Sequence, residues 1–303
     1  MDHQLLQDHG EISPFYLSLC ASSTIPSTMD TSLPPASYRY IATYATGYSA
    51  PPVSMPVAVD PMATLLTRSC ITLTFGRLQT QAYLSNLLGT SPQSIASMGV
   101  SFGSGSNAGA YLVVRGATAC IVDYDAAWIR GAGSLVPQTL WRPASDLDKV
   151  RLVDDAALKL PIWFDVIAGG VGISVADAVD GNRSELCDKD RQVSMNNRAT
   201  TTIRILTQGK QGHKQIHVRD DTSAKAPITR ERLLRQVGLA VEKIYTTLNL
   251  FSGPNDRHSL LILGIVHVSA GCWQPLLFQV APSRAPWYAQ HDTQTFPLPA
   301  YSA

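Results

Sequence analysis

The chain has 303 residues, of which 45% are hydrophobic and only 16% are charged, and its formal net charge is +1. An average soluble domain carries about 25% charged residues, so this composition predicts a folded protein whose surface repels copies of itself only weakly. Because a protein that neutralises phosphates needs clustered Lys and Arg, no direct nucleic-acid binding is expected.

Cysteine spacing and hydropathy indicate the compartment. The longest apolar run, from Leu260 to Val268, is far shorter than the roughly 20 residues that span a membrane. The start, MDHQLLQDHGEIS, lacks the cationic region of a secretion signal. We therefore expect a soluble protein with no membrane partner. Reduced thiols in a cytosolic compartment are expected because the five cysteines lie far apart with no C-x-x-C pair: Cys20, Cys70, Cys120, Cys187 and Cys272.

The N-terminal part, residues 1–61, is predicted to form an extended arm. Seven prolines between Ala21 and Met62 block regular helix. Within the arm, YRYIATYAT (38–46) alternates in the manner of one strand. An arm this poor in charge is expected to become ordered by docking.

A helical segment is predicted over residues 62–98. Met62–Arg68 and Arg77–Leu88 carry apolar residues at helical spacing, and Gly89 is expected to end the second helix.

Residues 99–228 are predicted to form a β-rich domain. Glycines and polar clusters separate its short runs of strand formers, which are YLVV, ACIVDY, PIWFDVIA, VGISV, TTIRILT and QIHV. One helix is expected to interrupt them, from Ser145 to Leu160, with Ser145 or Asp146 as its N-cap.

Residues 229–281 are predicted to form a long helix, followed by buried strands that pack with residues 62–98. Thr229 is the expected N-cap, and apolar residues follow a period near 3.6 to about Leu250, before Gly253-Pro254. This helix is either a core helix or a seam at a symmetry axis. The runs SLLILGIVHVSA and PLLFQVA are the predicted strands.

A second Pro-punctuated tail occupies residues 282–303. Aromatic side chains in an extended tail are good anchors for pockets on a neighbouring subunit. The late aromatics that could act in this way are Trp273, Trp287, Tyr288, Phe296 and Tyr301.

The stretch Gly99 to Gly103 matches G-x-S-x-G, the nucleophile elbow of serine hydrolases, with Ser101 as the candidate nucleophile. An elbow needs a buried strand before the serine and a helix after it. Here SPQSIASM precedes it and FGSGSNAGAYLVV follows, and neither fits. A hydrolase of this kind would complete its triad with a later acid and histidine, namely Asp165 or Asp177 and His217 or His267.

The glycines Gly103, Gly105 and Gly109 nearly match a dinucleotide-binding loop, and Asp123 lies where a ribose-binding acid would. The third glycine is displaced by one position, and no helix follows to receive a pyrophosphate. The pattern favours a Gly-Ser hairpin or loop between two strands. No cofactor is expected.

The histidines suggest structural roles. His213 and His217 would share a face of a strand, with Asp220 and Asp221 beyond them. Two histidines without a clear third ligand favour a polar hairpin over a metal site, so no metal is expected. His267, inside an apolar strand, indicates a hydrogen-bonded core histidine.

Residues 180–198, DGNRSELCDKDRQVSMNNR, mix both signs of charge. This pattern is typical of a solvated loop, and the alternative is an intersubunit ion-pair patch.

Proline-rich arms around a β-rich middle, in a neutral chain with reduced thiols, resemble the pattern of icosahedral virus shell proteins. The order helix, β region, helix over Met62 to Leu250 is similar to that of the trimeric outer-layer capsid proteins of reovirus-like double-stranded RNA viruses. The resemblance implies a trimer whose β region is a jelly roll on a helical base, packed in many copies over an inner shell.

The predicted fold class is α+β and mostly β in the middle, with a jelly-roll β-sandwich as its candidate form, a helical part and extended Pro-rich arms at both ends. The predicted function is a non-enzymatic capsid or shell subunit of a virion, assembled in the host cytoplasm. Its predicted partners are copies of itself and other shell proteins of the same particle. A serine hydrolase of α/β type using Ser101 is the alternative.

Overall fold

A computed structural model describes residues 60–281, apart from residues 96, 105–106, 116, 130, 196–198, 220–225 and 254. All the elements below belong to the unit Pro56–Ala303. The predicted arm 1–61 up to residue 59, including the predicted strand 38–46, lies outside the described residues, and so does the tail 282–303.

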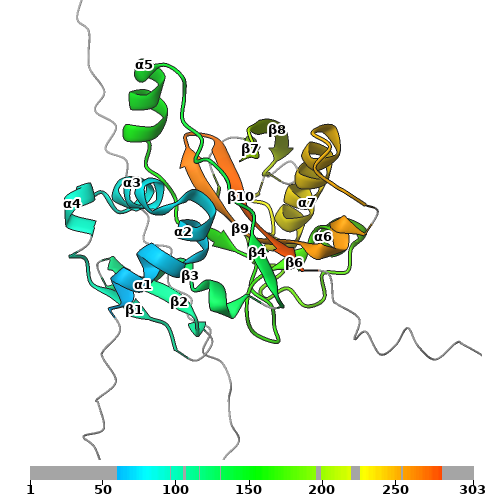
Figure 1. Cartoon of the computed structure of the whole chain (residues 1–303), viewed down its shortest axis with the longest axis horizontal. Helices are drawn as coiled ribbons and strands as arrows, with labels where there is room; N and C mark the ends of the chain where they lie inside the picture. Colours follow the sequence, from blue (N-terminus) through cyan, green and yellow to red (C-terminus); the bar gives the residue numbers. More distant parts are fainter. Residues whose placement is uncertain are drawn as a thin grey trace, which may run out of the picture. The chain divides into compact units, whose positions relative to one another are not determined.

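A mixed sheet of seven strands occupies the middle of this unit (Figure 1). Its main path runs β5-β9-β10-β7-β8, while β4 pairs with β10 and β6 pairs with β9. The strands of this sheet are β4 (Gly133–Leu135), β5 (Ile162–Trp163), β6 (Ile173–Ser174), β7 (Thr200–Thr207), β8 (Lys210–His217), β9 (Leu260–Ser269) and β10 (Cys272–Val280). The β9–β10 and β7–β8 pairs are antiparallel, whereas β10 and β7 run parallel.

A separate antiparallel sheet has the order β1-β2-β3. Its strands are β1 (Val100–Phe102), β2 (Ala110–Arg115) and β3 (Thr118–Tyr124). The helices are α1 (Pro61–Arg68), α2 (Cys70–Phe75), α3 (Arg77–Leu88), α4 (Pro92–Ile95), the 3₁₀ turn η2 (Ala126–Trp128), α5 (Asp146–Lys149), the π-helical turn η3 (Val150–Asp154), α6 (Val175–Asp180), α7 (Arg230–Thr247) and α8 (Asp256–Ser259).

Two hydrophobic clusters flank the large sheet. Strand β9 contributes Leu263 and Val266 to one cluster, which includes α1 to α3, and Ile262 and Ile265 to the other, which includes α7. Successive side chains of a strand point to opposite faces, so helices cover both faces of the sheet. The predicted α+β class is confirmed. A jelly roll is not confirmed, because this sheet contains a parallel pair and has helices on its two faces.

The predicted long helix is confirmed as α7. The hydroxyl of Thr229 accepts the N–H of Arg232, so Thr229 is the N-cap. The predicted apolar stripe is buried against α6, β7 and β8, which makes α7 a core helix within the described residues. It ends at Thr247, slightly before the predicted Leu250. The predicted helix Arg77–Leu88 is also confirmed, with Gly89 in the left-handed conformation at its end.

The predicted helix from Ser145 to Leu160 is too long. Ser145 is its N-cap, but helical structure ends at Asp154. The reason is tertiary, because the N–H of Lys159 donates to Nδ1 of His267 and draws the chain onto β9. Likewise VGISV, predicted as a strand, gives only two strand residues before Ser174 caps α6.

A buried carboxyl group joins α2 to β3; α2 lies in the predicted helical segment 62–98, between the two helices that the apolar spacing predicted there. Asp123 is fully buried, and it accepts the N–H groups of Ile71 (3.1 and 3.3 Å) and Tyr124 (2.7 Å). Ser69 and the N–H of Cys70 also hydrogen-bond to it. Burial raises the pKa of Asp123 to about 8, although these hydrogen bonds oppose the shift. The start of α2 is therefore fixed to the small sheet.

We expect Asp123→Ala to lower the free energy of unfolding by about 2–4 kcal/mol, because it leaves several buried N–H groups without an acceptor. Asp155→Ala, at an exposed position, is the control and should change it by no more than about 0.5 kcal/mol. Urea unfolding followed by circular dichroism measures both. Equal effects of the two substitutions would contradict this role of Asp123.

Candidate functional site

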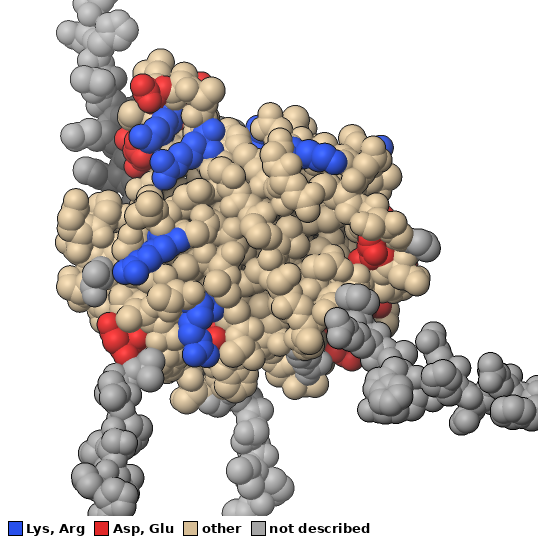
Figure 2. Space-filling model, viewed as in Figure 1, with Lys and Arg blue, Asp and Glu red and all other residues tan. Residues whose placement is uncertain are grey.

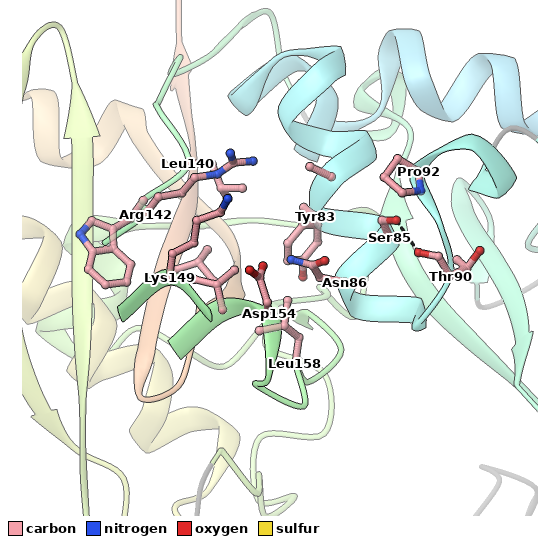
Figure 3. Close-up of a pocket in the computed structure, with 14 residues that line it drawn as sticks. Tyr83, Ser85, Asn86, Thr90, Pro92, Leu140, Arg142, Lys149, Asp154 and Leu158 are labelled. Carbon is pink, nitrogen blue, oxygen red and sulfur yellow. Dashed lines mark hydrogen bonds between the residues drawn. The ribbon is translucent and has the colours of Figure 1, made fainter. Parts of the chain in front are cut away.

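A groove lies beside α3, between that helix and the segment from Thr139 to Leu158 (Figure 3). It consists of two adjoining pockets of about 290 and 400 Å³ that share Leu140 and Arg142. We call it the α3 groove, and its lining residues are Leu78, Gln79, Ala82, Tyr83, Ser85, Asn86, Thr90, Pro92, Thr139, Leu140, Trp141, Arg142, Lys149, Val153, Asp154, Leu158 and Val268.

Hydrogen bonds fix the wall that faces α3. Oε1 of Gln79 accepts the N–H of Leu140 at 2.6 Å, which ties this wall to α3. Oε1 of Gln274 accepts the N–H of Trp141, also at 2.6 Å, which ties the same wall to β10. The guanidinium of Arg204 lies 4.6 Å from the centre of the Trp141 ring. These contacts within the chain therefore hold this wall of the groove in place.

Tyr83 contributes a buried phenol to the groove. The side chain is 2% exposed, and its hydroxyl has no hydrogen-bond partner among the described residues. Burial raises the pKa of Tyr83, and the nearby Asp123 carboxylate adds to the shift. The phenol thus stays neutral and can both donate and accept a hydrogen bond.

The remaining polar groups of the groove carry both signs of charge. Tyr83 and Asn86 of α3 lie across from Lys149 at the end of α5 and Asp154 at the end of η3. Arg142 lies beyond them (Figure 3). A small rim of polar groups over an apolar floor is typical of ligand sites. The amide of Asn86 can pair with a peptide group, and the charges can pair with either sign.

Ser101 lies in the middle of β1, paired with Leu112 of β2. Its strand leads into a hairpin loop rather than a helix, so Ser101 lacks the strand-turn-helix setting of a nucleophile elbow. The predicted triad partners have other contacts. Asp165 binds Arg230 and Tyr124, Asp177 caps α6 with Ser174, His217 pairs with Thr200 in the sheet, and His267 accepts from Lys159.

The predicted Gly-Ser hairpin is confirmed, because β1 and β2 pair antiparallel on either side of it. Gly109 has a φ of 82°, and a Cβ there would come within 2.2 Å of Cγ of Trp128. A close ring contact therefore explains this glycine. Asp123, the candidate ribose-binding acid, instead holds the start of α2.

The two histidines of β8 share a face, as predicted. His213 is opposite Arg204 and His217 is opposite Thr200. Asp220 and Asp221 lie outside the described residues. Among the residues that the structure describes, no group of three His, Cys, Asp or Glu side chains could hold a metal ion.

The prediction of a core histidine is confirmed for His267, which is 3% exposed on β9. Its ring stacks on Trp273, with centroids 4.6 Å apart. Trp273 is itself fully buried, so its prediction as an anchor for a neighbouring subunit is wrong. The other four late aromatics lie outside the described residues.

The described part of the predicted loop 180–198 after α6, residues 181–195, is an irregular segment that is only partly solvated. Leu186 and Met195 are buried within it. Arg183 pairs with Glu231 of α7 at 3.2 Å, so the segment packs against the start of that helix. The intersubunit patch stays a prediction.

A buried ion pair that sequence reasoning missed lies beside this segment. Arg230, the first residue of α7, pairs with Asp165 and also donates to the carbonyl oxygen of Trp163. Asp165 accepts the hydroxyl of Tyr124 at 2.9 Å. The cluster connects α7, β3 and the chain after β5.

Two further findings concern the cysteines and the hydropathy of the helices. Four of the five cysteines are described, and all four are free thiols. No helix in the described part of the chain is long and apolar enough to cross a membrane.

Comparisons of the chain with protein-family models, with curated proteins and with solved structures find no match.

We expect His267 to make stability depend on pH. Burial lowers the pKa of His267 to about 4, and the nearby Lys159 ammonium adds to this shift. Between pH 4 and 6.5 the unfolded chain binds a proton at His267 that the folded chain does not. The free energy of unfolding therefore falls as the pH falls through this range, by at most about 1.4 kcal/mol per pH unit. Comparing the wild type with His267→Gln in urea unfolding at pH 5 and 7 isolates the effect.

His213→Gln, at an exposed histidine of β8, is the matched control. It should keep the pH dependence of the wild type, whereas His267→Gln should flatten it. An unchanged slope in His267→Gln would show that this histidine is not held neutral by the core.

A fluorophosphonate probe should leave Ser101 unlabelled, because its hydroxyl lies in an extended strand rather than at the sharp turn where such a serine is activated. The wild type and Ser101→Ala should react equally in a gel-based labelling assay. Labelling that Ser101→Ala abolishes would revive the hydrolase hypothesis.

Proposed function

We propose that the protein is a structural subunit of a viral shell that assembles with copies of itself and carries out no catalysis. The observation that supports this most is a set of large apolar side chains left exposed on a folded unit. They are Leu73, Leu78, Phe102, Val114, Trp128, Leu147, Val150 and Ile167. Exposed apolar side chains that gather in one region mark interaction surfaces.

Three of these side chains belong to elements that line the α3 groove, and a fourth belongs to α2, which directly precedes α3. Leu78 of α3 is 81% exposed and Leu147 of α5 is 80% exposed. Leu73 and Val150 lie on the neighbouring turns of α2 and η3. Burying one such side chain stabilises an interface by about 1.5–3 kcal/mol. We call Leu73, Leu78, Leu147 and Val150 the apolar rim.

The charge distribution supports the same proposal. Figure 2 shows one face on which charged side chains gather over α5 and are otherwise scattered in small groups, with a wide area at the centre that has none. A shell subunit needs wide surfaces that accept copies of itself without like-charge repulsion. The sparse charge of the whole chain, 16%, agrees with this requirement.

The assembly that we propose is a homotrimer in the outer shell of a virion, such as that of a double-stranded RNA virus, in contact with other proteins of the particle. Its subunits would associate through neutral surfaces and through the arms 1–61 and 282–303. Many individually weak contacts sum to a stable shell when each subunit makes several at once. The proposal requires these surfaces and arms, and it does not require a jelly roll.

Light scattering over a concentration series tests the proposal. The wild type should form trimers or larger particles, and the double variant Leu78→Lys, Leu147→Lys should associate about tenfold more weakly, because each lysine replaces an apolar contact with a charge. Ile167→Lys, at an exposed apolar residue outside the apolar rim, is the matched control. A wild type that stays monomeric at every concentration would contradict the proposal.

A further inference from the structure

The α3 groove has one polar atom whose bonding is incomplete. The hydroxyl of Tyr83 is buried, lines the groove and has no partner among the described residues. Buried polar groups in folded proteins are almost always hydrogen-bonded, so this hydroxyl is available to pair with a polar group that enters the groove. We propose that the α3 groove binds the C-terminal segment, residues 282–303, of a second copy of the chain. This inference rests on the proposed assembly function.

The layout of the groove suits the side chains of an extended segment, because the groove consists of two adjoining pockets rather than one. The part that contains Tyr83 measures about 290 Å³, and the adjoining part continues past Leu140 and Arg142 towards Leu78. A row of two connected pockets suits a chain that places successive side chains along it.

The C-terminal segment has the chemistry that this groove requires. It contains four prolines, Pro282, Pro286, Pro297 and Pro299, which disfavour helix and reduce the entropy lost when an extended chain binds. It also carries large side chains that can act as anchors, and these are Trp287, Tyr288, Phe296, Leu298 and Tyr301.

The polar groups of the two partners also match. The hydroxyl of Tyr83 and the amide of Asn86 can bond to the peptide groups that an extended segment leaves unpaired. The segment has one acid, Asp292, and one base, Arg284. The groove offers the opposite charge to each, with Arg142 and Lys149 for the acid and Asp154 for the base.

The course of β10 places the start of the C-terminal segment away from the α3 groove of its own unit. The β9–β10 turn lies beside the groove, since Val268 lines it and the N–H of Ala270 donates to the carbonyl oxygen of Leu152. Strand β10 then runs away from it for nine residues, about 30 Å, to Val280 at the side of β4 and β6 (Figure 1). The 22 residues from 282 to 303 can span at most about 80 Å. They begin on the far side of the unit and can reach a neighbour.

Photo-crosslinking in the full chain tests this proposal. We would place p-benzoyl-L-phenylalanine at Trp287 or at Phe296, mix isotope-labelled and unlabelled chains, irradiate them and map the products by mass spectrometry. Crosslinks should join a labelled tail to α3 or to residues 140–158 of an unlabelled chain. Crosslinks within one chain only, or to other surfaces, would overturn the proposal.

Variants of the groove sharpen the test. Asn86→Trp fills the groove and should lower the intermolecular crosslinks about tenfold, whereas Gln211→Trp, at an exposed position of β8, should not change them. Tyr83→Phe removes only the hydroxyl and should lower them roughly threefold, whereas Tyr245→Phe, at a buried position of α7, should not. Unchanged crosslinks in Asn86→Trp would overturn the proposal.

Light scattering on the same samples separates this proposal from the proposed function. Particles that persist while the crosslinks map elsewhere would refute only the groove contact. Samples that remain monomeric and yield no intermolecular crosslinks would refute both.

Discussion

The β9–β10 hairpin is the constraint on which the rest of this fold depends. Its residues are buried almost throughout and contribute to the hydrophobic clusters on both faces of the sheet. A strand covered on two faces cannot alternate between apolar and polar residues, which explains the continuous apolar runs in the sequence. Gly264 permits a close approach of β5, because a Cβ there would come within 2.6 Å of the carbonyl oxygen of Ile162.

The few polar groups of this hairpin position the α3 groove. Gln274 of β10 holds Trp141, while the carbonyl oxygen of Pro275 accepts the amide of Gln138 at 2.7 Å. On β9, His267 holds Lys159, just after the groove residue Leu158. Buried polar groups must find partners, and here those partners are backbone and side-chain groups of the segment that forms one wall. The same core therefore gives the unit its stability and fixes the surface that we propose for assembly.

Local sequence patterns predict many of the helices and strands but not the α3 groove. Thr229 and Gly89 are residue types that favour helix ends, so they predict the ends of two helices. The apolar runs predict β9 and β10 without reference to distant residues. The shortened helix after Ser145 and the helix α2 depend on His267 and Asp123, which lie far away in the sequence. The groove draws Tyr83, Arg142 and Asp154 from three separate segments, and no spacing in the sequence links them.

The most direct test of this account is electron cryo-microscopy of particles formed by the purified full chain. The account predicts closed or extended assemblies of many copies, in which the apolar rim around Leu78 and Leu147 is buried against a neighbouring subunit. Assemblies whose interfaces leave these two side chains in solvent would contradict it, and so would a preparation that contains only dispersed single subunits.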